Sequence, residues 1–115
     1  MKQTKVLNLN GESEFAKEVR QSGLPVLVDF WAPWCMPCRM MAPTLEKLSL
    51  IMEGKIRVAK VDTENPINQQ LVIEYQIQSI PNMKLLKDGK VIGEFIGLRD
   101  LDIIKSEIEE IIKKL

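Results

Sequence analysis

The chain has 115 residues, enough for one domain with a single hydrophobic core and too few for two. Its 16 Lys and Arg residues balance its 16 Asp and Glu residues, which argues against a nucleic-acid-binding protein and against broad electrostatic attraction to anionic membranes. We therefore expect one domain over residues 1–115, a monomer without nucleic-acid or membrane partners.

The first residues, Met1 to Lys5, lead into only a short apolar stretch, without the continuous apolar core or cleavage site of a signal peptide. No apolar run approaches the roughly 18 residues that a membrane helix requires. The sequence is therefore typical of a soluble cytoplasmic protein, although a mature secreted chain would look the same.

Strand and helix signals alternate in the first part of the chain. Val6 to Leu9 is a short candidate strand, and Asn10 to Ser22 has helical spacing with Phe15 and Val19 on one face. Pro25 to Trp31 is rich in β-branched and aromatic residues without polar alternation. Such a run is typical of a strand that is covered on both faces, so we expect it at the centre of a sheet.

A helix is predicted next, starting near Cys35, because apolar residues recur at helical spacing at Met41, Leu45, Leu48 and Met52. Ile56 to Val61 is a second candidate for a buried strand. Asn65-Pro66 supplies an N-cap followed by proline at the first helical position. It should open a helix with Ile67 and Leu71 on its inner face.

The last third of the chain predicts a hairpin and a helix. Met83 to Leu86 and Val91 to Ile96 flank an Asp88-Gly89 turn, which indicates antiparallel neighbours. An apolar helical stripe follows, opposite a Lys- and Glu-rich face, and favours a core-facing helix over a partner-binding one: Leu101, Ile104, Ile108, Ile111 and Leu115. The whole order predicts an α/β fold, with a central mixed sheet of about five strands flanked by about four helices on both faces.

Both cysteines lie in the segment Trp34-Cys35-Met36-Pro37-Cys38, and the chain has no histidine. In a reducing cytosol, two cysteines at this spacing more often indicate redox chemistry or metal binding than a structural disulfide. At a helix N-terminus, Cys35 would be stabilised as a thiolate by the helix dipole and the free backbone N–H groups. Cys38, about one turn away, would be close enough to form a disulfide and better shielded. Cys35 would then attack a substrate disulfide, and Cys38 would resolve the mixed disulfide.

A metal site is the competing interpretation of the two cysteines. Structural zinc needs about four ligands, usually Cys and His, so one chain would have to add two carboxylates. A cluster shared by two chains could use four cysteines, but Pro37 and the helical position of Cys38 give it no special support. We expect no metal, and no nicotinamide or flavin either, since the sequence lacks a Gly-x-Gly-x-x-Gly motif.

Several segments, in this order and at these separations, resemble the thioredoxin family over essentially the whole chain: Val28-Asp29-Phe30-Trp31-Ala32, Trp34-Cys35-Met36-Pro37-Cys38, Ala42-Pro43, Lys60-Val61-Asp62, Ile80-Pro81, Asp88-Gly89 and Gly97. The resemblance implies a thioredoxin fold and a thiol-disulfide oxidoreductase with a redox-active Cys35–Cys38 disulfide. It also implies protein disulfides as substrates and a separate flavoprotein, thioredoxin reductase, as electron donor.

Asp29 is a lone acid in an otherwise apolar strand. We expect it to be buried, and because an unpaired buried carboxylate is costly its pKa should be raised; the alternative is an acid at the strand end that reaches water. The family resemblance also implies that Asp29 exchanges protons with Cys38. Lys60, on the neighbouring strand of that fold, would modulate this exchange, although a solvated strand-edge lysine fits the sequence nearly as well.

Ile80-Pro81 reads from the sequence alone as a turn, since few X–Pro bonds are cis. The resemblance implies that this bond is cis, that Pro81 faces the disulfide, and that the backbone of Ile80 can pair with an extended substrate segment. The next residue is Asn82, where the family usually has Thr. Gly97 would form the other wall of the groove, because it lets the partner backbone approach closely.

The residues around the cysteines have expected places as well. Trp31 is expected in the core and Trp34 on the docking face. Pro37 fixes φ near the first helical turn and should hold the two sulfurs in register. Met36 stands where the family most often has Gly; its side chain either contacts the substrate or is simply exposed, and its position makes it a candidate determinant of redox potential.

The alternative to an oxidoreductase is a binding module. In that interpretation the same fold is a protein-interaction adaptor, or one that carries a metal or cluster, and Cys35 and Cys38 are incidental. Substitution of Cys38 discriminates the two, because only an oxidoreductase would then accumulate a mixed disulfide with its substrate.

Overall fold

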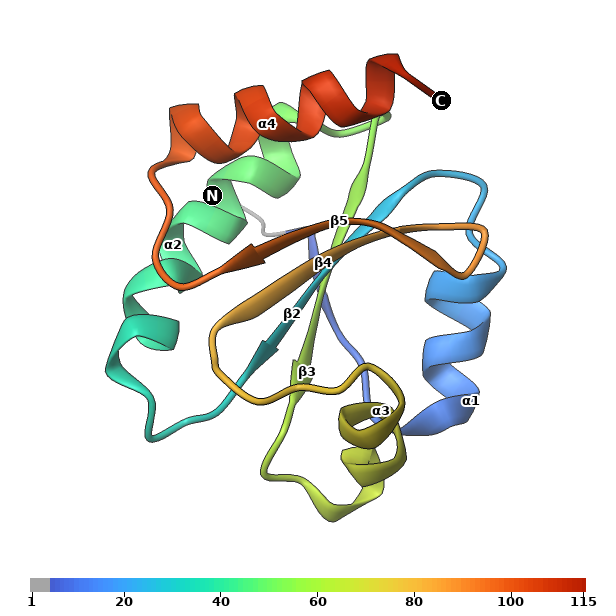
Figure 1. The fold of residues 1–115 in the computed structure, drawn as a ribbon, viewed down its shortest axis with the longest axis vertical. Helices are drawn as coiled ribbons and strands as arrows, with labels where there is room; N and C mark the ends of the chain where they lie inside the picture. Colours follow the sequence, from blue (N-terminus) through green and yellow to red (C-terminus); the bar gives the residue numbers. More distant parts are fainter. Residues whose placement is uncertain (1–4) are drawn as a thin grey trace.

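The computed structural model describes residues 5–115, which form a mixed five-stranded sheet with helices on both faces (Figure 1). Residues 1–4 lie outside the described residues. The prediction that Met1 to Lys5 has no signal-peptide features therefore falls almost entirely outside them. The strands are β1 (Val6–Asn8), β2 (Val26–Trp31), β3 (Arg57–Asp62), β4 (Asn82–Lys87) and β5 (Lys90–Ile96). The helices are α1 (Gly11–Phe15) with its π-helical continuation η1 (Ala16–Arg20), α2 (Met36–Ile51), α3 (Gln69–Glu74) after the 3₁₀ turn η2 (Pro66–Asn68), and α4 (Leu101–Lys113). No helix in the described part of the chain is long and apolar enough to cross a membrane.

The strand β2 lies at the centre of the sheet, whose order is β1-β3-β2-β4-β5, as its uninterrupted apolar sequence predicted. β1 and β2 both pair with β3 in parallel, and β4 pairs antiparallel with β2 and β5. Asp88 and Gly89 have φ values of 52° and 79° and close the predicted β4–β5 hairpin. Positive φ at both turn positions matches the twist of a two-residue hairpin.

Two apolar layers hold the helices on the sheet. In Figure 1, α2 and α4 cover one face, and α1 and α3 cover the other. The predicted stripe of α2 is buried in the first layer: Met41, Leu45, Leu48 and Met52. Phe15, Val19 and Leu71 are buried in the second layer. Sequence periodicity therefore placed these seven residues correctly.

The helix α4 packs on the core through the predicted stripe, but one member of that stripe was assigned wrongly. Ile104 and Ile108 are fully buried, and Ile111 is partly buried against the same layer. Leu115 is exposed instead. Because α4 ends at Lys113, Leu115 lies beyond the last helical turn and no longer follows the helical spacing.

The inner face of the segment η2–α3 also differs from the prediction, because Ile67 is 60% exposed and Asn68 is fully buried in its place. The segment starts as a 3₁₀ turn, so the inward positions are Asn68 and Leu71, three residues apart. The Asn68 side chain accepts a hydrogen bond from the Gly11 N–H at 2.7 Å and donates one to the Asp62 carbonyl at 2.9 Å. These bonds to two other segments favour the polar residue at the inner position.

Replacing Asn68 tests this assignment. Asn68→Ala should lower the free energy of unfolding by about 2 kcal/mol, because each buried polar group left without a partner costs about 1–3 kcal/mol. Ile67→Ala, at the adjacent exposed position, is the matched control and should change it by less than about 0.5 kcal/mol. Urea denaturation measures both values. A larger loss for Ile67→Ala would show that Ile67 is the residue that holds α3 in place.

Candidate active site

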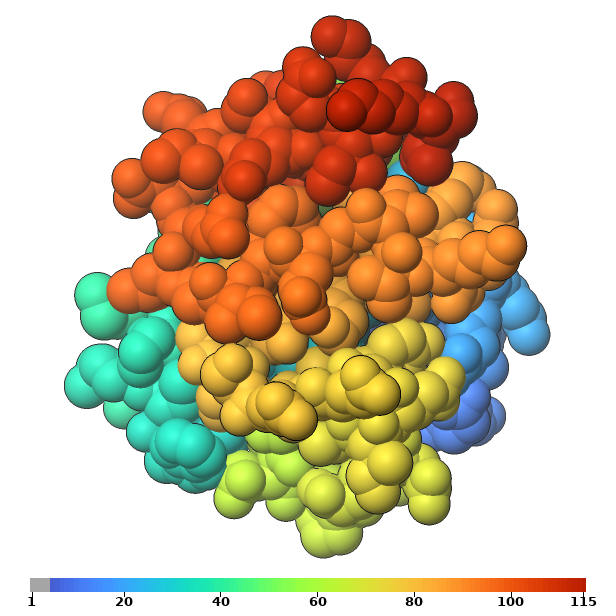
Figure 2. Space-filling view, viewed as in Figure 1, coloured from blue at the N-terminus to red at the C-terminus, as the bar shows by residue number. Residues whose placement is uncertain are grey.

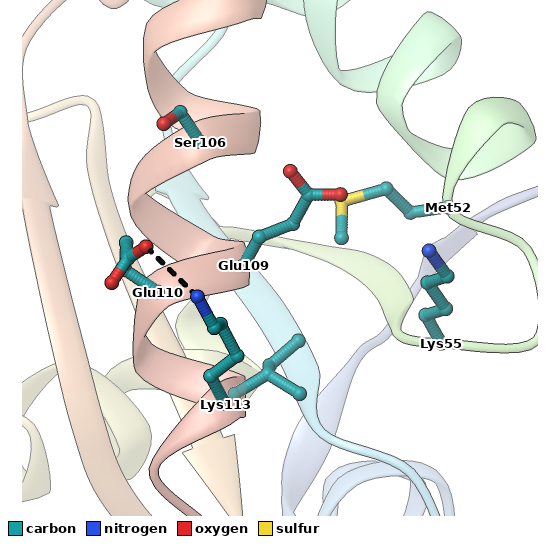
Figure 3. A pocket seen from close by; sticks show the side chains of 7 residues that line it. Met52, Lys55, Ser106, Glu109, Glu110 and Lys113 are labelled. Atoms are coloured by element: carbon teal, nitrogen blue, oxygen red, sulfur yellow. Dashed lines mark ion pairs between the residues drawn. The ribbon is translucent and has the colours of Figure 1, made fainter.

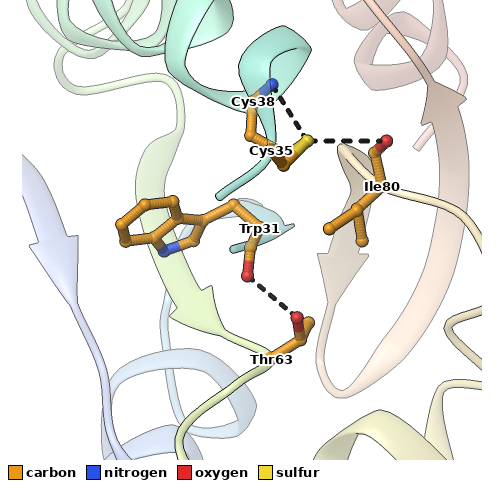
Figure 4. The surroundings of a disulfide bond; sticks show 5 residues. All are labelled: Trp31, Cys35, Cys38, Thr63 and Ile80. Carbon is orange, nitrogen blue, oxygen red and sulfur yellow. Dashed lines mark hydrogen bonds between the residues drawn. A yellow bond between two sulfur atoms is a disulfide. The ribbon is translucent and has the colours of Figure 1, made fainter. Parts of the chain in front are cut away.

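The two cysteines form a disulfide at the N-terminus of α2, with their Cα atoms 5.2 Å apart (Figure 4). Cys35 is the N-cap residue, and its sulfur accepts a hydrogen bond from the Cys38 N–H at 3.3 Å. Cys35 retains 5% of its surface, whereas Cys38 is completely buried. When the disulfide is reduced, the same N–H group and the N-terminus of a 16-residue helix would stabilise a thiolate on Cys35.

Pro37 lies in the first turn of α2, where a missing N–H removes no helical hydrogen bond. Met36 and Trp34 are 61% and 68% exposed on either side of Cys35. Met40, four residues after Met36, is exposed as well. Its spacing from Met36 was a signal for a shared helix face that the sequence prediction did not use.

Cys35 lies against the turn that precedes β4. Its sulfur is 3.9 Å from the carbonyl oxygen of Ile80 (Figure 4). A sulfur in a disulfide has no proton, so this is a contact that only a reduced Cys35 thiol could turn into a hydrogen bond. The Ile80–Pro81 peptide bond is cis, as the resemblance implied. Within residues 5–115, neither the N–H nor the C=O of Ile80 has a backbone hydrogen-bond partner.

Gly97 lies directly after β5 and donates its N–H to the Pro81 carbonyl at 2.8 Å. This bond places the two predicted groove residues beside each other. Gly97 has φ of +87°, a conformation that strains any residue with a Cβ atom. The side chains of Ile96 and Leu98, on either side of Gly97, are both exposed.

Asp29 is fully buried near the middle of β2, so it is not an acid at a strand end. Neither carboxylate oxygen has a hydrogen-bond partner among residues 5–115. Burial raises the pKa of Asp29 to about 7, against an opposing effect of the Lys60 ammonium group. By the alternation of side chains along a strand, Asp29 and Leu27 share a face, and Leu27 packs in the layer under α2. Asp29 therefore faces the helix that carries both cysteines.

Lys60 lies beside Asp29 in the parallel register of β2 and β3. β3 is flanked by β1 and β2, so Lys60 is not on an edge strand, and it is half-buried. Its ammonium nitrogen lies 4.1 Å from the centre of the Trp31 ring. Trp31 packs against the cluster of Ala32 and the two cysteines. It thus has the packing role expected of it, and it also contacts the lysine that adjoins Asp29.

Thr63 was not predicted at this site. Its N–H and its Oγ1 both donate to the carbonyl of Trp31, at 2.8 and 3.0 Å (Figure 4). These bonds tie the end of β2 to the loop after β3. Thr63 reaches Trp31 because β2 pairs with β3. No local pattern in the sequence indicates this contact.

A hollow of about 440 Å³ lies beside Trp34, and we call it the Trp34 pocket. It is lined by Trp34, Thr63, Glu64, Gln69, Val72, Ile77, Gln78 and Ile80. Figure 2 shows the teal segment around residue 35 and the gold segment around residue 80 on the same face of the molecule. Because Trp34 and Ile80 both adjoin Cys35, this pocket opens next to the disulfide.

A second hollow, of about 560 Å³, lies between the end of α2 and α4 (Figure 3). Its lining includes Met52, Lys55 and Ile112. Glu110 and Lys113 also line it and form an ion pair at 3.6 Å. None of its lining residues contributes to the cysteine cluster. In the described part of the chain, no group of three or more Cys, Asp or Glu side chains is placed to hold a metal ion.

Comparison with known proteins agrees with this geometry. The thioredoxin family model matches residues 5–110. Thioredoxin 1 of Nostoc sp. is 46% identical over 86 residues, which cover 75% of this chain and 78% of the relative. A thioredoxin of Synechocystis sp. is 39% identical over 99 residues, 86% of this chain and 91% of the relative. A mitochondrial thioredoxin of Mus musculus is 37% identical over 108 residues, 94% of this chain and 61% of the relative.

The buried carboxyl group of Asp29 should make stability depend on pH. Its pKa is about 7 in the folded protein and 3.8 ordinarily, so folding favours the protonated form. The stabilisation is complete below about pH 4 and is lost as pH rises toward 7, by on the order of 4 kcal/mol. Asp29→Asn should remove this loss, so the oxidised variant should be more stable than the wild type at pH 8 and the difference should vanish near pH 4.

Urea denaturation of the oxidised protein between pH 4 and pH 8 measures this difference. Asp102→Asn, at an exposed position of α4, is the control for loss of one negative charge. A difference between Asp29→Asn and wild type that stays constant with pH would contradict the raised pKa.

Proposed function

The chain belongs to the thioredoxin family and is a thiol-disulfide oxidoreductase, and we propose that it reduces protein disulfides in the cytoplasm with Cys35 as nucleophile and Cys38 as resolving thiol. The observation that carries this proposal is the disulfide at the N-terminus of α2, in which Cys35 is reachable and Cys38 is buried. A dithiol in this geometry can give two electrons to a substrate disulfide and form the Cys35–Cys38 disulfide.

The reaction has two exchange steps. In the first, the Cys35 thiolate attacks one sulfur of a substrate disulfide; the substrate S–S bond breaks, a mixed disulfide forms, and one substrate thiolate leaves and takes up a proton. In the second, the Cys38 thiolate attacks the Cys35 sulfur, which closes the Cys35–Cys38 disulfide and releases the second substrate thiolate. The substrate gains the two electrons that the dithiol loses.

The second step requires the buried Cys38 thiol to lose its proton, and we propose that the Asp29 carboxylate accepts it. A general base works best when its pKa lies near the working pH, and that of Asp29 is about 7. Asp29 faces α2 and has no hydrogen-bond partner of its own within residues 5–115, so its carboxylate is available as an acceptor. Lys60 acts through Asp29, because its ammonium group lowers the pKa of that carboxyl group. The ammonium group also contacts the Trp31 ring.

The substrate segment is proposed to bind in extended form beside Ile80. The N–H and C=O of Ile80, which have no backbone hydrogen-bond partner within residues 5–115, offer the pattern of an exposed strand edge, on which an extended peptide adds main-chain hydrogen bonds. Pro81 and Gly97 form the walls of the groove, and Gly97 leaves room for the partner backbone. Trp34 and Met36 provide the exposed apolar rim.

The electrons are proposed to come from a separate flavoprotein, thioredoxin reductase, with the chain acting as a monomer that binds no cofactor of its own. This follows the usual partner of the family and the lack of a dinucleotide-binding motif in the sequence. The adaptor alternative is not favoured, because incidental cysteines would not explain a buried acid, Asp29, that has no hydrogen-bond partner among residues 5–115 and faces the helix of the disulfide.

Cys38→Ser tests the division of labour between the cysteines. The pre-reduced variant should form a mixed disulfide with a disulfide-containing protein such as insulin and retain it, because the resolving thiol is missing. Non-reducing electrophoresis and mass spectrometry should show the adduct on Cys35. Cys35→Ser is the matched control and should neither form the adduct nor reduce the substrate. Retention of disulfide reduction by Cys35→Ser would refute the proposal.

Met36→Gly tests the residue that departs from the commonest family sequence. It should shift the redox midpoint of the Cys35–Cys38 pair by up to about 30 mV, a tenfold change in equilibrium constant, because residues between the cysteines affect thiolate stability. Equilibration with glutathione buffers measures the midpoint. Met40→Ala, one turn further along the exposed side of α2, is the control and should leave it unchanged. An unaltered midpoint in Met36→Gly would leave Met36 with a surface role only.

A further inference from the structure

The Trp34 pocket is placed to receive a side chain of the substrate segment. It shares Ile80 with the proposed substrate groove, and Trp34 directly precedes Cys35. The Ile80 carbonyl is 3.9 Å from the Cys35 sulfur, so a peptide bound at Ile80 passes the mouth of this pocket. Its volume of about 440 Å³ lies in the roughly 300–1,000 Å³ range of ligand pockets.

Glu64 makes the pocket acidic. It is the one charged residue among those that line it, and no Lys or Arg lines the pocket. The Glu64 carboxylate has no ion-pair or hydrogen-bond partner anywhere in residues 5–115. The Glu64 N–H donates to the Asp62 carboxylate at 2.8 Å, which fixes the start of the Glu64 side chain and places a second acid next to it.

The other polar groups of the pocket can accept hydrogen bonds. The Gln69 amide nitrogen donates to the Thr63 carbonyl at 2.8 Å, and the amide oxygen has no hydrogen-bond partner within residues 5–115, so it can accept one. Gln78 is exposed, and its amide has no partner within the described chain. The indole of Trp34 is mostly exposed and offers an aromatic surface in the same pocket.

We propose that the Trp34 pocket is a specificity site that binds a basic side chain, with arginine preferred, close to the cystine of the substrate; this rests on the proposed function. A guanidinium group is flat, carries five N–H donors and stacks on aromatic rings. It can pair with Glu64, donate to the amide oxygens of Gln69 and Gln78, and lie on the Trp34 indole. An ammonium group would pair with Glu64 but would stack less well, and an acidic side chain would be repelled.

Matched peptide substrates test this proposal. One set of disulfide-linked peptides carries a single arginine in turn at the two positions before and the two after the cysteine, and a second set carries glutamine there. Single-turnover reduction by the pre-reduced protein is followed as formation of the reduced peptides, separated by chromatography, and the readout is the ratio of the second-order rate constants for arginine over glutamine. At one or more positions this ratio should reach about five at low salt, the size expected of one exposed ion pair together with one cation–π contact.

Variants of Glu64 identify the group responsible. Glu64→Gln should bring the ratio close to one, and Glu64→Lys should bring it below one. Glu53→Gln, which removes an acid just beyond the C-terminus of α2, is the matched control and should keep the ratio of the wild type. The ratio should also fall as salt is added, because exposed charges are screened.

The outcomes separate this proposal from the function on which it rests. If both peptide sets are reduced and the ratio is one at every position, the specificity site is refuted and the reductase function stands. A ratio that persists in Glu64→Gln would also refute it, since the preference would then come from another group. If neither peptide set is reduced, the proposed function itself has failed.

Discussion

The packing of α2 on the central sheet is the constraint on which the site depends. The helix buries its apolar stripe in one layer with β2, and this contact sets its N-terminus at the end of that strand. Cys35 therefore occupies a helix N-cap, and Cys38 lies inside the first turn. Hydrophobic burial is not directional, but here it fixes the relative positions of two sulfur atoms whose reaction requires a defined geometry.

Asp29 shows how stability and chemistry compete at this site. A carboxyl group without a hydrogen-bond partner is costly in the interior, and an apolar side chain would suit the position better. The same burial moves the pKa of Asp29 to about 7, where a carboxyl group can both accept and return a proton. Lys60 limits the shift from the neighbouring strand. The burial that makes Asp29 costly for folding is therefore also what suits it to the proposed proton transfer.

The surface around Cys35 combines general and selective features. The backbone of Ile80, which forms no backbone hydrogen bond within the described chain, and the exposed side chains of Trp34 and Met36 suit any extended segment, because main-chain bonds and apolar contacts depend little on its sequence. Glu64 in the Trp34 pocket adds a charge without a partner in the described chain. A reductase of many proteins can thus still rank its substrates.

Local patterns in the sequence predicted the element order, most of the two buried faces and the cysteine pair, because periodicity and the Asp-Gly turn are properties of single segments. It failed at Ile67, where a 3₁₀ turn and the hydrogen bonds of Asn68 reversed the expected inner face. A buried Asp29 was expected from the sequence and the cis bond before Pro81 from the family resemblance, and the structure has both. The Thr63 bonds to Trp31 and the pocket around Glu64 were not predicted and emerge only from the packed fold. Each depends on segments distant in the chain, and the free energy of such contacts is not encoded in the pattern of any one segment.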